Sequence, residues 1–173
     1  MKTTRGPTRS ALTLIEILIV VMILAIGAMI VIPSIGSTAD TQAVGAARVL
    51  QADLEVARSL ALTTQQSYSL VFSPDKQSYK VVANYTGVAY ATAVAVGHPV
   101  NAGKLFEVTL SRLNGMPLVT VTNVSFGGPT YVTFLSQGDP VAAGSVTIQA
   151  GAVEMVVAVE GLTGIVTATR TQG

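Results

Sequence analysis

The sequence predicts an α+β protein in which a long N-terminal helix packs on an antiparallel β-sheet domain. Three observations predict this fold. Residues 12–32 form an almost unbroken apolar run, which is long enough for a membrane-spanning helix. Residues 43–61 then place apolar side chains at spacings of three and four, which is typical of one helix face. From about Gln66 the apolar positions alternate with a period of two, as they do in half-buried strands.

The composition excludes several classes of protein. Hydrophobic residues make up 50% of the 173 residues and charged residues 11%, whereas a disordered chain needs low hydrophobicity and high net charge. The 10 Lys and Arg nearly balance the 9 Asp and Glu, so no strong positive field is available to attract nucleic-acid phosphates. The absence of cysteine excludes a disulfide framework, a thiolate zinc site and a cysteine nucleophile.

The N-terminal segment has the charge pattern of a membrane anchor. Residues 1–11 contain Lys2, Arg5 and Arg9 and no acidic residue, and the apolar run of residues 12–32 follows directly. A helix of that length spans about 32 Å, close to the ~30 Å hydrocarbon core of a bilayer. The basic flank predicts that the N-terminus stays cytoplasmic and that the chain after the run crosses the membrane. A cleaved secretory signal peptide is the alternative, although its apolar region is usually about 7–15 residues and ends at a small-residue cleavage site.

Glu16 does not fit a plain anchor. It is the only charged residue within residues 12–32. A carboxylate within a membrane helix costs roughly 2.5–3.5 kcal/mol near the bilayer centre and less near the edge. Two interpretations are open. The side chain is solvated at the level of the lipid headgroups, or it pairs in an assembly with a cation such as a neighbour's α-amino group, which is charged near neutral pH.

The helix is expected to continue through an amphipathic second half over residues 34–62. Its apolar positions lie on one face: Ala43, Ala46, Ala47, Leu50, Leu54, Ala57 and Ala61. Polar and charged side chains occupy much of the opposite face. This pattern predicts that the helix packs against a β-rich globular domain at residues 63–173.

Turn signals divide the β-rich domain into strands. Residues 67–72 and 78–83 flank a turn with Pro74 and Asp75, which predicts a hairpin. Residues 87–100 are rich in Ala, Val and Gly without a clear period, so we expect a loop or an extended edge there. Further strands are expected at residues 105–110, 118–124, 130–135, 145–149, 152–160 and 165–169.

The junction between the basic flank and the apolar run reads Ala11-Leu12-Thr13-Leu14-Ile15-Glu16. This junction resembles the class III signal of type IV pilins and type II secretion pseudopilins. The resemblance implies that residues 1–11 are a leader, that a prepilin peptidase cuts between Ala11 and Leu12, and that Leu12 is then methylated. Residues 12–33 would form the membrane-spanning and filament-core helix, with Glu16 acting in subunit assembly. The chain departs from the family in Ala11, which is normally Gly, and in Leu12, which is normally Phe or Met.

Pro33 supports the same resemblance. In a chain that begins at Leu12 it stands twenty-second, where the family usually has a proline that kinks the helix. A proline at this position removes one helical N–H and clashes with the preceding turn, so it bends or locally melts the helix.

Three further segments narrow the resemblance: Ala57-Arg58-Ser59-Leu60-Ala61, Phe134-x-x-x-Gly138 and Gly164-Ile165-Val166. Together they are similar to GspH/FimT-type minor pseudopilins. The resemblance implies a pilin-like fold and a structural subunit of a type II secretion pseudopilus that serves protein export. The implied partners are the prepilin peptidase, other pilins or pseudopilins in a filament, and the bacterial inner membrane. The globular domain would then lie in the periplasm or outside the membrane.

Two other functions remain open. A FimT-like minor pilin of a type IV pilus could take part in DNA uptake through a basic C-terminal segment. That segment has only Arg170 here, so no nucleic-acid partner is expected. The other possibility is an anchored periplasmic domain that joins no filament, and a peptidase-dependent shift in size would separate it from a pseudopilin.

The sequence offers little for catalysis or metal binding. His98 is the only histidine and has no acid nearby in the sequence, so we expect it to be structural. Ser59, Ser125 and Ser136 lack the G-x-S-x-G setting of an activated nucleophile. The acidic residues of the domain are dispersed. We therefore expect no enzyme activity, no cofactor and no metal site.

Overall fold

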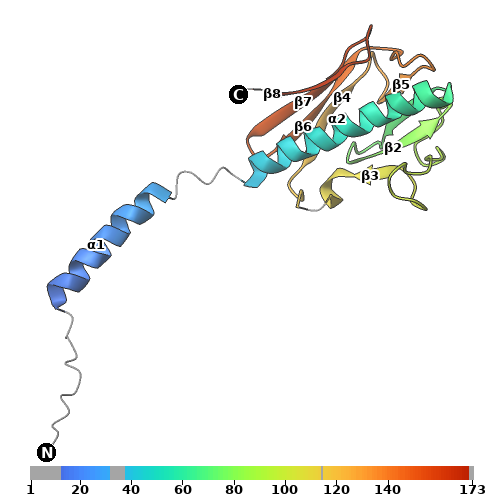
Figure 1. Ribbon diagram of the computed structural model, residues 1–173. Helices are drawn as coiled ribbons and strands as arrows, with labels where there is room; N and C mark the ends of the chain where they lie inside the picture. The colour runs from blue at the N-terminus through green and yellow to red at the C-terminus, as the bar shows by residue number, and fades with distance from the viewer. Residues whose placement is uncertain (1–12, 32–37, 114, 172–173) are drawn as a thin grey trace, which may run out of the picture. The chain divides into compact units, whose positions relative to one another are not determined.

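The computed structural model describes the backbone of residues 13–31, 38–113 and 115–171 and, outside residues 27–31, their side chains. The chain forms two units, Met1–Gly36 and Ser37–Gly173. The first contains helix α1 (Leu14–Val31), and the second begins with helix α2 (Thr38–Thr64) (Figure 1). Helical structure is therefore present in both halves of the predicted long helix, while the predicted kink at Pro33 lies outside the described residues.

Two antiparallel sheets follow α2. Their orders are β3-β2-β1-β5 and β4-β6-β7-β8. The predicted α+β class is confirmed, but the strands divide between two sheets, which the sequence did not indicate. Within the described residues the strands are β1 (Tyr68–Phe72), β2 (Ser78–Ala83), β3 (Glu107–Thr109), β4 (Thr120–Ser125), β5 (Tyr131–Phe134), β6 (Gly144–Ala150), β7 (Val153–Val159) and β8 (Val166–Thr171), with a 3-10 helix, η2 (Leu110–Arg112), after β3.

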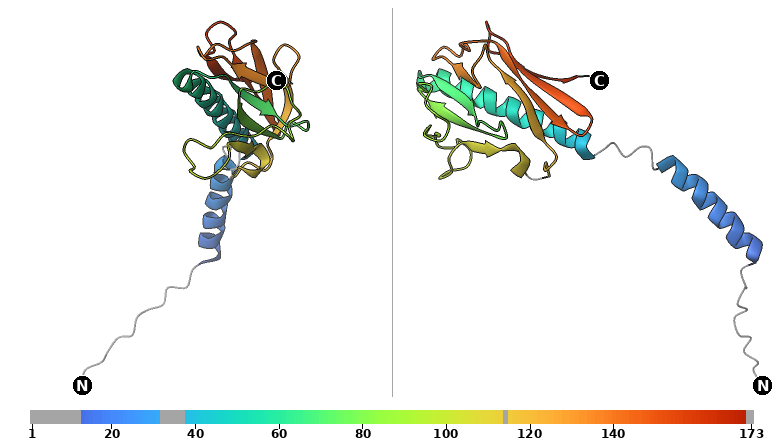
Figure 2. Two further views of the ribbon diagram at one scale, coloured as in Figure 1. Left: turned by 90° about the vertical axis from the view of Figure 1, so that its right-hand side faces the viewer. Right: turned by 180° about the vertical axis from the view of Figure 1, so that it is seen from behind.

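One face of α2 joins the two sheets into a common core. The helix packs against β1 and β5 of the first sheet and against β6, β7 and β8 of the second. In the left view of Figure 2, α2 lies on one side of the domain with strands of both sheets on the other. Its buried apolar side chains are the predicted ones: Ala43, Ala46, Ala47, Leu50, Leu54, Ala57 and Ala61. Five of these seven are alanine, so backbone and strands can approach closely, and the two leucines supply most of the buried volume.

In the first sheet, β1 and the middle of β2 are buried on both faces, whereas alternation predicts strands with one face in water. All five residues of β1 are buried. Leu70 and Phe72 belong to the main core with α2. Val71 on the opposite face forms a second apolar cluster with Val82 and Ala93. Period-two alternation alone could not predict this arrangement, because the covering residue Ala93 comes from a distant loop.

Lys80 holds that loop over the outer face. The ammonium donates to the carbonyls of Tyr90 and Ala93 at 3.1 and 3.2 Å. It also lies 4.1 Å from the centre of the Tyr90 ring, a cation–π contact. The loop pairs with itself through a bridge between Gly97 and Leu105, and the Val96 N–H donates to the Val81 carbonyl of β2 at 2.9 Å. Residues 87–100 are thus mainly a covering loop, one of the two predicted alternatives, and the strand expected at 105–110 is shorter because Leu110 turns into the core.

Candidate assembly surfaces

α1 exposes large apolar side chains around its circumference. Every side chain described in this helix is exposed, and the large apolar ones range from 85% exposed at Leu14 to 50% at Val20. An all-round apolar helix has no polar face for water, so it requires another apolar environment to cover it. Among the helices in the described part of the chain, none combines the length and hydropathy of a membrane span.

Glu16 is the only charged residue of α1 and lies in its first turn. Its backbone N–H donates to the Thr13 carbonyl at 3.0 Å, and its side chain is exposed. A carboxylate at this end of a helix is favoured by the helix dipole. Within the described residues Glu16 has no ion-pair partner. The remaining predicted positions, Ala11, Leu12 and Pro33, lie outside the described residues.

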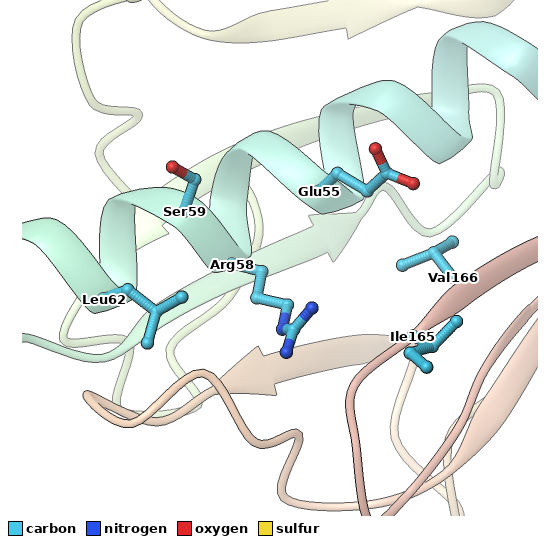
Figure 3. Close-up of a pocket in the computed structure, with 6 residues that line it drawn as sticks. All are labelled: Glu55, Arg58, Ser59, Leu62, Ile165 and Val166. Atoms are coloured by element: carbon cyan, nitrogen blue, oxygen red, sulfur yellow. The ribbon is translucent and has the colours of Figure 1, made fainter.

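A second surface lies beside α2. A groove of about 250 Å³ separates the helix from the start of β8. Figure 3 shows the Arg58 side chain extending from α2 into this groove. The groove is lined by Glu55, Arg58, Ser59, Leu62, Ile165 and Val166. Its walls therefore combine apolar side chains with one cation and one anion.

Arg58 joins the three segments that carry the resemblance to minor pseudopilins. Its Nε donates to the Gly138 carbonyl at 3.0 Å. A Cβ at Gly164 would lie 2.7 Å from that carbonyl oxygen and 3.1 Å from the Arg58 Nε, so only glycine fits. Gly138 and Gly164 both have positive φ, which glycine adopts at little cost. The motif arginine of α2 thus holds the Gly138 turn by a hydrogen bond, and the Gly164 turn lies close against that bond.

Comparison with known proteins identifies the family. A family model described as type II transport protein GspH matches residues 46–163, which is more than half of the chain. The chain belongs to the GspH family. The prediction of a GspH-type minor pseudopilin is therefore confirmed. No curated protein sequence matches this GspH-family chain at a significant level.

Solved structures support the same fold. Two structures of the minor pseudopilin EpsH from the type II secretion system of Vibrio cholerae match with TM-scores of 0.51 and 0.55, both at 12% identity. These matches cover 75% and 78% of the GspH-family chain and 96% and 98% of EpsH. The type IV minor pilin FimU of Pseudomonas aeruginosa matches with a TM-score of 0.53 and 19% identity, covering 77% of this chain and 95% of FimU. At these identities the likeness shows a shared pilin-like fold.

The GspH-family chain also contains a partly buried polar pair that sequence reasoning missed. The Tyr79 hydroxyl, on a fully buried side chain of β2, donates to the Asp53 carboxylate of α2 at 2.6 Å. Burial raises the pKa of the Asp53 carboxyl, and the hydrogen bond from Tyr79 and the nearby His98 offset part of that rise. Burial and the Asp53 charge hold the pKa of Tyr79 well above its usual range. No sequence signal links these residues, which are 26 positions apart.

His98 has the structural role expected from the sequence. Its Nδ1 accepts the backbone N–H groups of Val100 and Asn101 at 3.1 and 3.2 Å, and its ring packs on Phe106 with centres 4.6 Å apart. Within the described residues, no group of three or more His, Cys, Asp or Glu side chains is arranged to hold a metal ion. The side chain therefore closes a loop turn in this structure.

Replacing Asp53 by asparagine should change how stability depends on pH. A carboxyl whose pKa is raised in the folded chain stabilises the fold while protonated. That contribution is complete below the ordinary value of 3.8 and is lost as pH rises through the raised pKa. The amide oxygen introduced by Asp53→Asn still accepts the Tyr79 hydrogen bond, but the amide does not titrate. Urea unfolding of a chain lacking residues 1–33 should show wild type losing stability relative to Asp53→Asn as pH rises from about 4 toward 7.

Asp75 provides a matched control, because the fold shifts its pKa in the opposite direction to that of Asp53. Hydrogen bonds from the Ser73 hydroxyl and the Gln77 N–H lower the pKa of this exposed carboxyl. The ionised Asp75 carboxylate therefore stabilises the fold at pH values above its ordinary pKa. This contribution to stability is lost as pH falls through the lowered pKa. Asp75→Asn should therefore lose stability relative to wild type as pH rises. If the stability of wild type and the stability of Asp53→Asn depended on pH in the same way, the ionisation of Asp53 would not be coupled to folding.

Proposed function

We propose that this GspH-family minor pseudopilin is a structural subunit of a type II secretion pseudopilus and takes part in protein export. Residues 12–33 anchor the chain in the bacterial inner membrane before assembly, with the globular domain on the periplasmic side. During assembly the apolar helix leaves the lipid and packs against the corresponding helices of other pseudopilins. The chain acts by binding its neighbours, and the peptidase and methyl donor act upon it.

The observation that carries this proposal is an apolar helix joined in sequence to a domain of the GspH family. Lipid and a bundle of similar helices are the two environments that cover such a helix without a polar face. A helix that exchanges one environment for the other loses no apolar burial, since lipid tails and packed helices are both apolar. The family and the helix therefore support the same role.

Glu16 supplies the specificity in this proposal. Once the leader is removed, the α-amino group of Leu12 on a neighbouring subunit is free to pair with the Glu16 carboxylate. Both charges are costly in an apolar bundle unless they are paired, so they favour one register between adjacent helices. The alternative of solvation at the membrane edge requires no such neighbour.

The mature N-terminus provides the direct test. Protein extracted from membranes of the native host should have the intact mass of a chain that begins at Leu12 and carries one N-methyl group. Replacing Ala11 by a bulky residue such as Phe should block the cut, because the position before the scissile bond accepts small side chains in this family. An unprocessed wild-type chain, or one that begins after Ile35, would contradict the proposal.

The phenotype of a deletion separates the two machines. Loss of the chain should abolish export of type II substrates and leave type IV pili on the cell surface. The opposite outcome is a loss of pili with normal export. It would assign the chain to a type IV pilus, to which the structurally similar minor pilin FimU belongs. Restoration by the wild-type gene, but not by the Ala11→Phe variant, would show that the phenotype depends on processing.

A further inference from the structure

Exposed apolar side chains gather at one end of the globular unit. Leu162 is 87% exposed, Ile165 50%, Leu135 45% and Leu62 42%. They come from the last turns of α2, the turn between β5 and β6, and the segment between β7 and β8, which Figure 1 shows at the same end of the domain. We term these four side chains the helix-end patch. Exposed apolar side chains that share one end of a domain and have polar neighbours mark interaction surfaces.

The framework beneath the helix-end patch is rigid. The hydrogen bond from Arg58 to Gly138 and the close fit of Gly164 hold the two turns against α2. Leu62 packs directly against Gly138, where an added Cβ would lie 3.0 Å from its side chain. The Leu135 carbonyl accepts the Gly138 N–H at 2.8 Å. A surface that is ordered before binding loses little entropy when a partner docks.

The turn that carries Leu162 is ordered in the same way. The Gly164 N–H donates to the Glu160 carbonyl at 2.9 Å, and the Thr163 hydroxyl donates to the Glu160 carboxylate at 2.6 Å. Leu162 lies within the segment that these two hydrogen bonds close, and its side chain is exposed. Its exposure is therefore set by the turn rather than by local disorder.

The polar edge of the patch is mainly acidic. Glu160 and Asp139 lie in the two turns that carry Leu162 and Leu135. The Nε of Arg58 donates to the Gly138 carbonyl. Its terminal guanidinium nitrogens extend into the groove between α2 and the start of β8. A partner that presents apolar side chains edged by basic groups would match this surface, since complementary charge favours the correct encounter.

The position of the patch indicates which partner covers it. The chain enters the domain at Thr38, and α2 then runs for 27 residues, or about 40 Å, to the end that carries the patch. In the proposed filament each domain is tethered through its Thr38 end, so its other end faces a subunit further along the filament. We infer that the helix-end patch docks onto the globular domain of the next pilin-like subunit, at an apolar surface edged by basic side chains. This inference rests on the proposed function.

Cysteine crosslinking tests the contact in the full chain. The protein has no cysteine, so a single introduced thiol reports one position. Leu162→Cys, labelled with a maleimide that carries a photoreactive benzophenone, should crosslink to a neighbouring pseudopilin when assembled filaments are irradiated. Val94→Cys is the matched control, because Val94 is 76% exposed but follows Ala93, which packs on Val71 and Val82 of the first sheet. Equal crosslinking at both positions would overturn the inference.

Charge substitution tests whether the contact contributes to assembly. Leu162→Lys and Ile165→Lys place a cation in the expected apolar contact, beside the basic edge of the partner. They should reduce the amount of the chain in sheared filaments about tenfold, as expected for a central interface residue. Val94→Lys should leave it unchanged. The substituted side chains are exposed, so circular dichroism and membrane levels of all three variants should match wild type.

The outcomes separate this inference from the proposed function. If wild-type chain is found in filaments but the Leu162 and Ile165 variants enter them equally well, the patch is not the contact and the pseudopilin role stands. If the wild-type chain is absent from filaments, the proposed function fails and the inference fails with it. The inference is supported if both lysine variants are depleted from filaments and if crosslinking occurs at position 162 but not at position 94.

Discussion

Replacing Glu16 by Leu is expected to abolish incorporation of the chain into a filament while leaving the protein inserted and folded. The substitution makes α1 more apolar, so membrane insertion should not suffer. The globular unit makes its own core, so its stability should be unchanged. In an assembled bundle, however, the variant would leave the α-amino group of a neighbour buried without a partner. Removing one member of a buried ion pair costs about 3–5 kcal/mol, enough to reduce assembly by two orders of magnitude or more.

Crosslinking between subunits in membranes, together with the export of a type II substrate, measures this effect. Met22→Leu is the matched control, because it alters the same exposed helix without changing charge or apolar character. It should crosslink and support export like wild type. If Glu16→Leu does so as well, Glu16 is a solvated residue at the membrane edge, the other interpretation that the sequence leaves open.

Replacing Gly144 by Ala should cause a large loss of stability in the globular unit. Gly144 begins β6 at the point where β4 ends, and Ser125 pairs with the neighbouring Ser145. A Cβ at Gly144 would lie 2.2 Å from the Ser125 carbonyl oxygen and 2.3 Å from a ring carbon of the buried Phe126. Backbone and a core ring must both move, so the cost should reach the upper end of the overpacking range, about 3 kcal/mol.

Gly97→Ala is the matched control for this clash. Gly97 is also a paired backbone position, bridging to Leu105, but an added Cβ there meets nothing within 4 Å. Urea unfolding of chains lacking residues 1–33 should show a lower midpoint for Gly144→Ala and an unchanged midpoint for Gly97→Ala. Equal midpoints for both variants would mean that β4 and β6 separate at little cost, contrary to the close packing of this sheet.

The amphipathic face of α2 was predictable because it is a local property. Residues three and four apart share a helix face whatever the rest of the chain does, so Leu50 and Leu54 could be assigned to the core from spacing alone. The strands β6 and β7 followed from alternation for the same reason, with buried Val146, Ile148 and Val157 on the inner side. Each of these predictions depends only on a short stretch of consecutive residues.

Pairing between distant segments could not be predicted in this way. β1 lies between β2 and β5 in the first sheet, while β4 joins the second sheet with β6. Alternation shows which side chains face a core but carries no information about which strand lies alongside. The burial of both faces of β1 likewise depends on a loop held by Lys80, whose sequence has no clear period.

The sequence by itself determined the division of this protein into an apolar helix, an amphipathic helix and a β-rich domain, and the place of Glu16 near the start of the apolar helix. It also marked Arg58, Gly138 and Gly164 as family-like positions without indicating that they touch. Only the tertiary structure brought Arg58 against both turns, paired Asp53 with Tyr79 and placed Leu62 against Gly138 and in one groove with Ile165. The physical reason is that helix faces and strand alternation arise from interactions between near neighbours, whereas these contacts join residues tens of positions apart and form only when the whole core packs.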